Sequence, residues 1–443
     1  QRVMSFRAWR HWFVGLPWSL KWFVILVLLR PLVDALYFLK DISPFLSPLY
    51  IVGGLTPVLI AASYLSDSFP EKRFSGVDLF FVLWAWLSLF NAMVLVGKDG
   101  LSVDSLGHLL YFVTPAFIYL YVRHFIQSKQ DLQGLITTVL YSIIVPSVLI
   151  VYENLFMPLS TQLSRDMTRF QGIWADVVSY GMFFTTGLLA ACYFFLERDT
   201  GVPDGKRVRV LVAVTITGLI GLLSIHHSAS WIIFIVVFAL FVWHSTGGRT
   251  SLSMLVVVVL VAGSYLIFGD AISASFGNTI QRELNVIERE DKGIEDLFHG
   301  RGHRWAAFLA LWEPMPSLSK LFGVTFGTLD MRWQSVPVRY MTLRGVHSDY
   351  FRLLFATGLV GLIAYLFFLG GTFVRSLRLP KAERFLVWGG LAILVLYSVS
   401  TTPTLYATIQ YICFSIIAYA ASPGTATLAS PTAPRFRPVA QIA

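Results

Sequence analysis

Twelve apolar segments run through the chain and constrain its fold more than any other feature. Each is about 20 residues long, the length that a helix needs to cross the hydrocarbon layer of a membrane. A backbone in lipid must satisfy its own hydrogen bonds, so such segments cross as α-helices. The segments are residues 22–39, 47–65, 77–96, 107–122, 132–156, 171–196, 209–225, 229–244, 252–269, 349–374, 385–401 and 404–421. We therefore predict an all-α polytopic membrane protein with about 12 transmembrane helices.

Composition agrees with this class of protein. Of the 443 residues, 56% are hydrophobic and 13% are charged, whereas soluble domains contain about 25% charged residues. The net charge of +9 comes from Lys and Arg residues dispersed over many short loops, so we expect no nucleic-acid partner. Cys192 and Cys413 lie within apolar segments and are predicted to be small buried side chains rather than a disulfide.

The distribution of Lys and Arg predicts the orientation of the chain. With the N-terminus placed in the cytoplasm, the inner loops hold nineteen of these residues and the short outer loops hold four, namely Lys40, Lys98, Arg165 and Arg169. Short cytoplasmic loops are the ones enriched in positive residues. We therefore expect both termini in the cytoplasm.

This orientation divides the chain into four parts. Residues 1–269 hold transmembrane helices 1–9, and residues 349–421 hold helices 10–12. Between them, residues 270–348 form a large periplasmic segment, whose apolar residues recur at helical spacing and predict helices. Residues 422–443 are rich in Ala, Pro, Ser and Thr, and we expect them to form a disordered cytoplasmic tail.

Three basic side chains are expected at the outer face. Arg169 opens the sixth span in MTRFQGIW, Arg301 lies in HGRGHRW of the periplasmic segment, and His347 precedes the tenth span in GVHSDY. Guanidinium groups bind phosphate oxygens bidentately and keep their charge. An imidazole, with an ordinary pKa of about 6.5, can accept a proton from a sugar hydroxyl. The alternative is structural: an Arg at a helix end reaches toward the lipid headgroups, and a His makes a hydrogen bond within the fold.

Other charged residues are candidates for supporting roles. Glu153 and Asp176 lie near the outer ends of spans five and six, where either could orient an arginine. Arg352, five residues after His347, is expected to face the same cavity. The periplasmic segment supplies three more cations, which are Arg304, Arg339 and Arg344.

Two other polar groups are expected to be structural. Arg30 and Asp34 are four residues apart in the first span, so they can neutralise each other. His226 and His227 occupy a short outer turn between two spans and are predicted to be interfacial.

Metal chemistry is not expected. The sequence has no Walker-type phosphate loop, no HExxH, no CxxC and no Asp-x-Asp pair. His299 and His303 are four residues apart, but they lack an evident third ligand. We therefore predict no metal site and no cofactor.

Three stretches resemble motifs of the O-antigen ligase and polymerase superfamily. They are RFQGIW, then GRGHRW with the LFGVTFG run that follows it, and then HSDYFRLLFATGLVG; together they cover about residues 170–195 and 298–370. The matching residues are Arg169 and Gly172; Arg301, Trp305, Gly323 and Gly327; and His347, Ser348, Gly358 and Gly361. The chain departs from the family at HHSASW, residues 226–231, where the family often has a Ser-Arg-Gly run.

The resemblance implies a GT-C-like, inverting and metal-independent glycosyltransferase in the inner membrane of a bacterium, with its active site facing the periplasm. The donor would be a glycan on undecaprenyl diphosphate. Arg169 and Arg301 would hold the diphosphate, and His347 would activate or position the acceptor hydroxyl. The missing Arg near residues 226–230 leaves open whether Arg304, Arg339 or Arg344 replaces a phosphate contact.

Three functions remain open at this point. The first is a polymerase of surface polysaccharide, which joins lipid-linked repeat units and for which a chain-length regulator is a candidate partner. The second is an O-antigen ligase, which transfers a glycan from undecaprenyl diphosphate to lipid A core. The third is a transporter of lipid-linked glycans, which would place charges in mid-span or contain paired broken helices. The expected outer grouping of Arg169, Arg301 and His347 argues against it.

Overall fold

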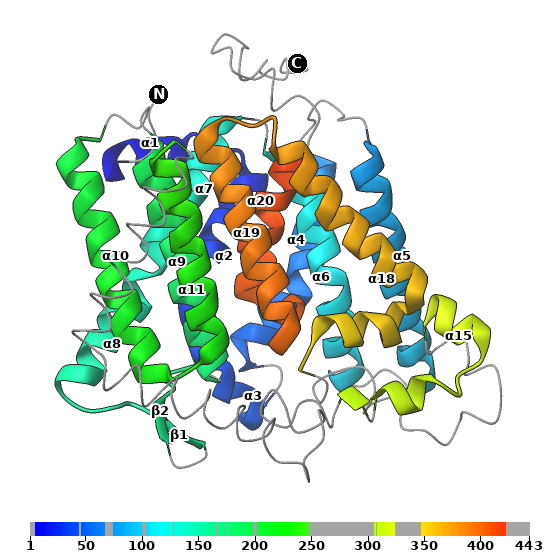
Figure 1. The fold of residues 1–443 in the computed structure, drawn as a ribbon. Coiled ribbons are helices and arrows are strands. Elements are labelled where there is room, and N and C mark those ends of the chain that lie inside the picture. Colours follow the sequence, from blue (N-terminus) through cyan, green and yellow to red (C-terminus); the bar gives the residue numbers. More distant parts are fainter. Residues whose placement is uncertain are drawn as a thin grey trace, which may run out of the picture.

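The computed structural model describes residues 5–43, 46–66, 74–99, 103–126, 128–164, 167–174, 176–197, 202–247, 305–306, 308–323 and 347–421. Over these ranges the chain is a bundle of long helices (Figure 1). The strands in the described ranges are β1 (Thr161–Ser164) and β2 (Met167–Phe170), which pair antiparallel. The predicted all-α class therefore holds for the described residues except for this short hairpin.

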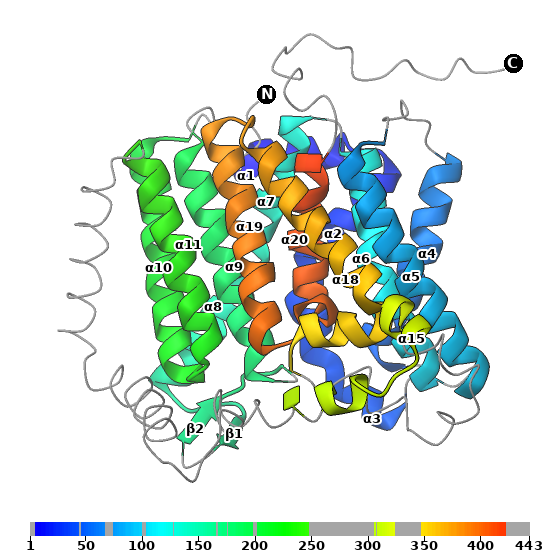
Figure 2. The ribbon, with the colours of Figure 1, turned by 45° about the vertical axis from the view of Figure 1, so that its right-hand side comes forward.

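The bundle has two ends. One carries the β1–β2 hairpin and α15 (Ser317–Phe322), and we call it the hairpin end; the other carries α1 (Phe6–Val14), and we call it the α1 end (Figures 1 and 2). The helices that connect the two ends are α2 (Trp18–Ala35), α4 (Pro48–Ser66), α5 (Gly76–Asp99), α6 (Val103–Phe125), α7 (Lys129–Ser142) with α8 (Ile144–Leu155), α9 (Val177–Leu196), α10 (Asp204–Ile225), α11 (Ser228–Ser245), α18 (Asp349–Ser376), α19 (Lys381–Ser400) and α20 (Ala407–Ala421). Shorter turns of helix are η1 (Leu36–Phe38), α3 (Leu39–Ile42) and η7 (Pro403–Leu405).

Seven helices within the described ranges are long and apolar enough to cross a membrane. They are Gly76–Val94, Lys129–Leu155, Val177–Leu196, Asp204–Ile225, Ser228–Ser245, Asp349–Ser376 and Lys381–Ser400. Tyr50–Ser66 and Ala407–Ala421 are shorter apolar helices. The chain thus has the helices of a multi-pass membrane protein. The count of twelve stays a prediction, and the expected span 252–269 lies outside the described residues.

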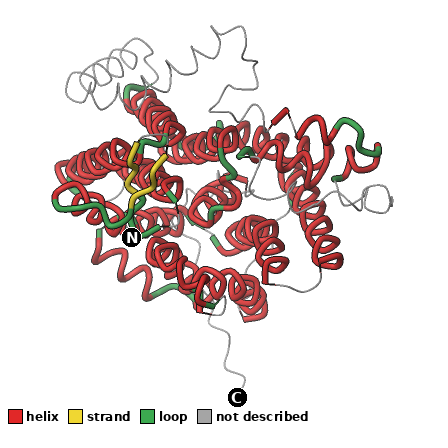
Figure 3. Tube along the Cα trace, turned by 90° about the horizontal axis from the view of Figure 1, so that it is seen from below, coloured by secondary structure: helices red, strands yellow, loops and turns green. Residues whose placement is uncertain are grey.

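Helix α9 lies deep in the bundle. Almost all of its residues are buried, and it packs against α7, α10, α11 and α19. Two glycines allow this close packing, because a Cβ at Gly181 would lie 2.2 Å from the Ser230 hydroxyl and one at Gly187 would lie 2.7 Å from the Ile143 side chain. Seen from the hairpin end in Figure 3, the helices stand side by side with the hairpin over one part of the bundle.

The start of α9 differs from the prediction. The expected span 171–196 begins at Val177, because Asp176 ends the preceding loop and its carboxylate accepts a hydrogen bond from the Ser179 amide at 2.7 Å. Asp is a favourable N-cap residue for this reason. Gly172 turns the chain with a φ of 65°, and Arg169 lies on strand β2 rather than at the helix start.

Helix α18 is broken at Gly358, where φ is 68° and ψ is −173°. α15 packs against this break, and a Cβ at Gly358 would lie 2.3 Å from the Leu321 carbonyl. The approach is reciprocal, because a Cβ at Gly323 would lie 2.4 Å from the Ala356 oxygen. Both positions therefore require glycine for space as well as for backbone conformation.

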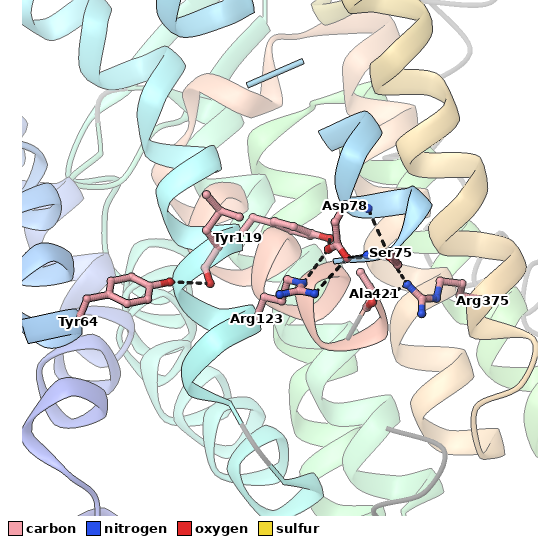
Figure 4. A network of polar contacts seen from close by, with 8 residues as sticks. Tyr64, Ser75, Asp78, Tyr119, Arg123, Arg375 and Ala421 are labelled. Carbon is pink, nitrogen blue, oxygen red and sulfur yellow. Dashed lines mark hydrogen bonds and ion pairs between the residues drawn. The ribbon is translucent and has the colours of Figure 1, made fainter. Parts of the chain in front are cut away.

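The α1 end holds a buried ion pair between α5 and α6 (Figure 4). The Asp78 carboxylate accepts hydrogen bonds from Arg123 Nε at 2.7 Å and from the Tyr119 hydroxyl at 2.8 Å. Both side chains of the ion pair are almost wholly buried. A buried charge needs such partners, because leaving it unpaired costs several kcal/mol, on the order of 3–5.

Helices α18 and α20 join the same network (Figure 4). Arg375 donates to the Ala421 carbonyl at 2.7 Å and to the hydroxyl of Ser75, which in turn donates to Asp78 at 2.7 Å. Arg123 and Arg375 thus lie at the same end of the bundle.

Candidate functional site

Polar residues from distant parts of the sequence meet at the hairpin end. They come from strand β2, the turn between α10 and α11, the last turn of α19, η7 and the start of α18. All of these elements lie at the same end of the bundle (Figures 1 and 2). Arg169 and His347 belong to this group, so the described residues place two of the three predicted outer cations at one end.

His347 stands immediately before α18 in a left-handed backbone conformation, with a φ of 49°. The next two residues are fixed to the end of α19: the Ser348 hydroxyl donates to the Ser398 carbonyl at 3.0 Å, and the Asp349 amide donates to the Thr401 carbonyl at 3.1 Å. A positive φ at a non-glycine residue is uncommon and needs support from its surroundings. These two bonds hold the backbone around His347.

Behind His347, Asp349 and Arg352 form a buried ion pair. Arg352 Nε donates to Asp349 Oδ1 at 2.7 Å, and both side chains are almost inaccessible. The Thr404 amide and hydroxyl each donate to the Asp349 carboxylate at 2.9 Å. Arg352 also donates to the Thr404 hydroxyl. This arrangement ties the first turn of α18 to η7 and gives Arg352 a supporting role for the helix start.

Asp349→Asn is expected to lower the free energy of unfolding by about 3–5 kcal/mol, because it leaves the Arg352 charge buried without its partner. Thermal unfolding in detergent, followed by tryptophan fluorescence, measures the change. Asp204→Asn is the matched control: Asp204 also pairs with an arginine three residues later, but its side chain is 88% exposed, so we expect a loss of about 1 kcal/mol or less. Equal losses of unfolding free energy in the two variants would contradict the conclusion that the Asp349–Arg352 pair stabilises the fold through its burial.

The turn between α10 and α11 is linked to the same last turn of α19. His227 Nδ1 shares a hydrogen bond with the Ser230 hydroxyl at 2.7 Å, and the Ser230 hydroxyl is 2.8 Å from the Tyr397 hydroxyl. Tyr397 directly precedes Ser398, the residue that accepts the Ser348 bond. A continuous path of contacts therefore leads from the α10–α11 turn to the residue beside His347.

Arg169 lies on the neighbouring hairpin. It lies on β2 opposite Gln162, and β2 packs against α10. His226 ends α10 with a φ of 45°. Burial lowers the pKa of His226, and the positive charge of Arg169 lowers that pKa further. Arg169 is therefore close enough to act electrostatically on the turn.

The two candidate carboxylates have partners of their own. Glu153 is buried and accepts from the Leu159 amide at 3.0 Å and the Tyr180 hydroxyl at 3.2 Å. Asp176 caps α9 and accepts from the Tyr406 hydroxyl at 2.9 Å. These contacts join α8 to α9, and the start of α9 to the residue that follows η7, at the hairpin end. That either carboxylate orients an arginine stays a prediction.

Several predicted site residues lie outside the described ranges, namely Arg301, Arg304, Arg339 and Arg344. The described residues nearest to the GRGHRW run pack on α18: the rings of Trp305 and Phe351 stack with centroids 5.5 Å apart, and Phe308 meets Phe355 edge to face at 5.3 Å. The segment that follows Arg301 in the chain is thus seated on the helix that His347 precedes.

Arg30 and Asp34 pair as expected, at the hairpin half of α2. The Thr408 hydroxyl donates to Asp34 at 3.3 Å, and Arg30 lies over the Tyr411 ring, 5.6 Å from its centroid. Within the described part of the chain, no three His, Cys, Asp or Glu residues gather as metal ligands would. His299 and His303 lie outside it.

Sequence reasoning gave His226, His227, Ser230 and Tyr397 no functional role. The signal that could have indicated a role was the HHS turn, which is predicted on the same side of the membrane as Arg169. The contact between Ser230 and Tyr397 joins residues 167 positions apart, so the sequence alone does not reveal it. No protein-family model matches this chain, and comparison with curated proteins gives no match either.

Proposed function

We propose that this protein is an inverting, metal-independent membrane glycosyltransferase that polymerises undecaprenyl-diphosphate-linked repeat units of a surface polysaccharide. One observation carries the proposal. A continuous path of contacts at the hairpin end connects the α10–α11 turn, which lies in the field of Arg169, with the residues beside His347. The cation that we assign to the diphosphate and the base that we assign to the acceptor therefore lie at the same end of the bundle.

The chemistry assigns a separate task to each group. The acceptor hydroxyl oxygen forms a bond to the anomeric carbon of the donor glycan, while the bond from that carbon to the diphosphate oxygen breaks on the opposite face. The hydroxyl proton goes to His347, and the negative charge of the departing diphosphate is met by Arg169 and Arg301. Stabilising charge that develops on a leaving group is a large term in catalysis, and a positioned imidazole adds base assistance.

The bonds that fix the backbone next to His347 support its role as the base. Its positive φ, the bonds of Ser348 and Asp349 to the end of α19, and the buried pair below them leave the backbone little freedom. A reacting group is most effective when its supports are already in place before the substrate arrives.

The proposal places the hairpin end in the periplasm and the α1 end in the cytoplasm of a bacterial inner membrane. The grouping of Arg123, Lys129, Arg375 and Lys381 at helix ends on the α1 side supports this orientation, because short cytoplasmic loops are rich in Lys and Arg. Both termini would then lie in the cytoplasm.

The test is an assay with purified protein and lipid-linked repeat units. A ladder of longer lipid-linked glycans supports the polymerase. Product that forms only after lipid A core is added supports the ligase instead, and passage of the lipid-linked glycan across vesicles without new bonds supports a transporter. A ladder that lengthens or narrows when a chain-length regulator is added would identify such a protein as a partner.

EDTA is expected to leave the rate of transfer unchanged, because guanidinium groups rather than a divalent ion meet the charge of the leaving diphosphate. The measurement compares initial rates with and without EDTA, using a metal-dependent transferase in the same buffer as the positive control. Loss of activity that Mn²⁺ restores would contradict the mechanism.

A further inference from the structure

The α10–α11 turn contains a histidine whose conformation and surroundings are not explained by packing. His226 adopts a φ of 45° at the end of α10, a left-handed conformation that costs energy at a non-glycine residue. Asn, Asp and His tolerate this conformation better than most side chains. Glycine would fit at lower cost, so a purely structural turn gives no reason for an imidazole at this position.

The imidazole is half-buried, and its two nitrogens differ. Among the described residues, Nδ1 of His226 is buried without a hydrogen-bond partner. A proton on this atom would bury an unpaired N–H group, which costs about 1–3 kcal/mol. Burial lowers the pKa of His226 and so favours the neutral ring, and a neutral ring with Nδ1 as its acceptor carries the proton on Nε2. The nearby charge of Arg169 favours the same neutral form.

The neighbouring histidine has a different environment. His227 is buried and shares a hydrogen bond with Ser230 at 2.7 Å, and its ring is parallel to that of Tyr397. His227 thus belongs to the path toward α19. Arg169, whose charge acts on His226, belongs to strand β2, which packs against α10. The two adjacent histidines therefore differ, because His227 makes a hydrogen bond within the fold and His226 is influenced by the charge of Arg169.

We propose that His226 is a substrate-binding residue, whose neutral imidazole donates a hydrogen bond from Nε2 to a phosphate oxygen of the same diphosphate group that Arg169 binds. This inference rests on the proposed function for the identity of the anion. A neutral donor beside a guanidinium adds a directional bond without adding a second positive charge next to the first. It thereby fixes which oxygen of the diphosphate faces Arg169.

The test measures binding of inorganic diphosphate to the purified full-length protein by titration calorimetry. His226→Asn keeps a side chain that tolerates the left-handed backbone but shortens its reach, and His226→Gly relieves the backbone entirely. We expect both variants to raise the Kd for diphosphate by about 10-fold or more, the typical effect of losing a hydrogen bond to a charged group. His11→Asn, at an exposed position of α1 on the opposite end, is expected to leave Kd unchanged.

Each other outcome has a definite meaning. Wild-type affinity in both His226→Asn and His226→Gly, with wild-type transfer of lipid-linked glycans, would overturn the role of His226 while the proposed function stands. Weaker binding in His226→Asn with full binding in His226→Gly would also overturn it, because the effect would then come from the backbone. Absence of diphosphate binding in the wild-type protein would overturn this inference, and a parallel failure of transfer would overturn the proposed function with it.

Discussion

Replacing His347 with Ala is expected to lower the rate of glycan transfer by about 10²- to 10⁴-fold, the range that removal of a general base produces. The reason is that the acceptor hydroxyl loses the group that receives its proton. The measurement is the initial rate at saturating donor, so that the change falls in kcat. Binding of inorganic diphosphate is expected to stay within about twofold of wild type, because the imidazole acts on the acceptor.

His347→Asn separates loss of the base from loss of the backbone conformation. Asn tolerates the positive φ observed here but cannot serve as a base near neutral pH. We therefore expect His347→Asn to be as impaired as His347→Ala, with an unfolding temperature close to that of the wild type. Full activity in His347→Asn would remove His347 from the mechanism.

Replacing Arg169 with Gln is expected to reduce the rate of transfer by about 10²- to 10³-fold, as removal of one donor to a developing negative charge does. Arg169→Lys keeps the charge but loses the bidentate fork, so its rate should fall between those of Arg169→Gln and the wild type. Both rates are measured with the same lipid-linked repeat unit.

The matched control for this prediction is Arg10→Gln. Arg10 is an exposed arginine of α1, at the opposite end of the bundle, and its loss changes net charge equally. We expect its rate to match the wild type. Similar losses in Arg10→Gln and Arg169→Gln would mean that general surface charge, not a binding contact, sets the rate.

Hydrophobic length predicted the helices well. The expected segment 349–374 lies within α18, 385–401 nearly coincides with α19, and 77–96 lies within α5. Such segments are predictable because one property, apolar length, decides whether a helix can span a membrane. The boundary of α9 was wrong by six residues, because the capping carboxylate of Asp176 follows a stretch that is itself apolar.

The surroundings of the site were not predictable by the same means. Strands β1 and β2 have four residues each, too few for an alternating pattern to stand out. The bonds that fix the start of α18 reach Ser398, Thr401 and Thr404, about fifty residues further along the chain. Local periodicity carries no information on such pairings. The resemblance of short motifs identified Arg169 and His347 as candidates, but not the residues that position them.

The break in α18 at Gly358 bears on how this helix can bend. The first turn of α18 is held by the bonds of Asp349 to Thr401 and Thr404, and the last turn by the bonds of Arg375. Between these two fixed ends, the backbone of α18 departs from helical geometry at Gly358, and we expect the helix to bend there. Because α15 packs against that break, we expect a movement of α15 to change the angle of the short helical segment that follows His347.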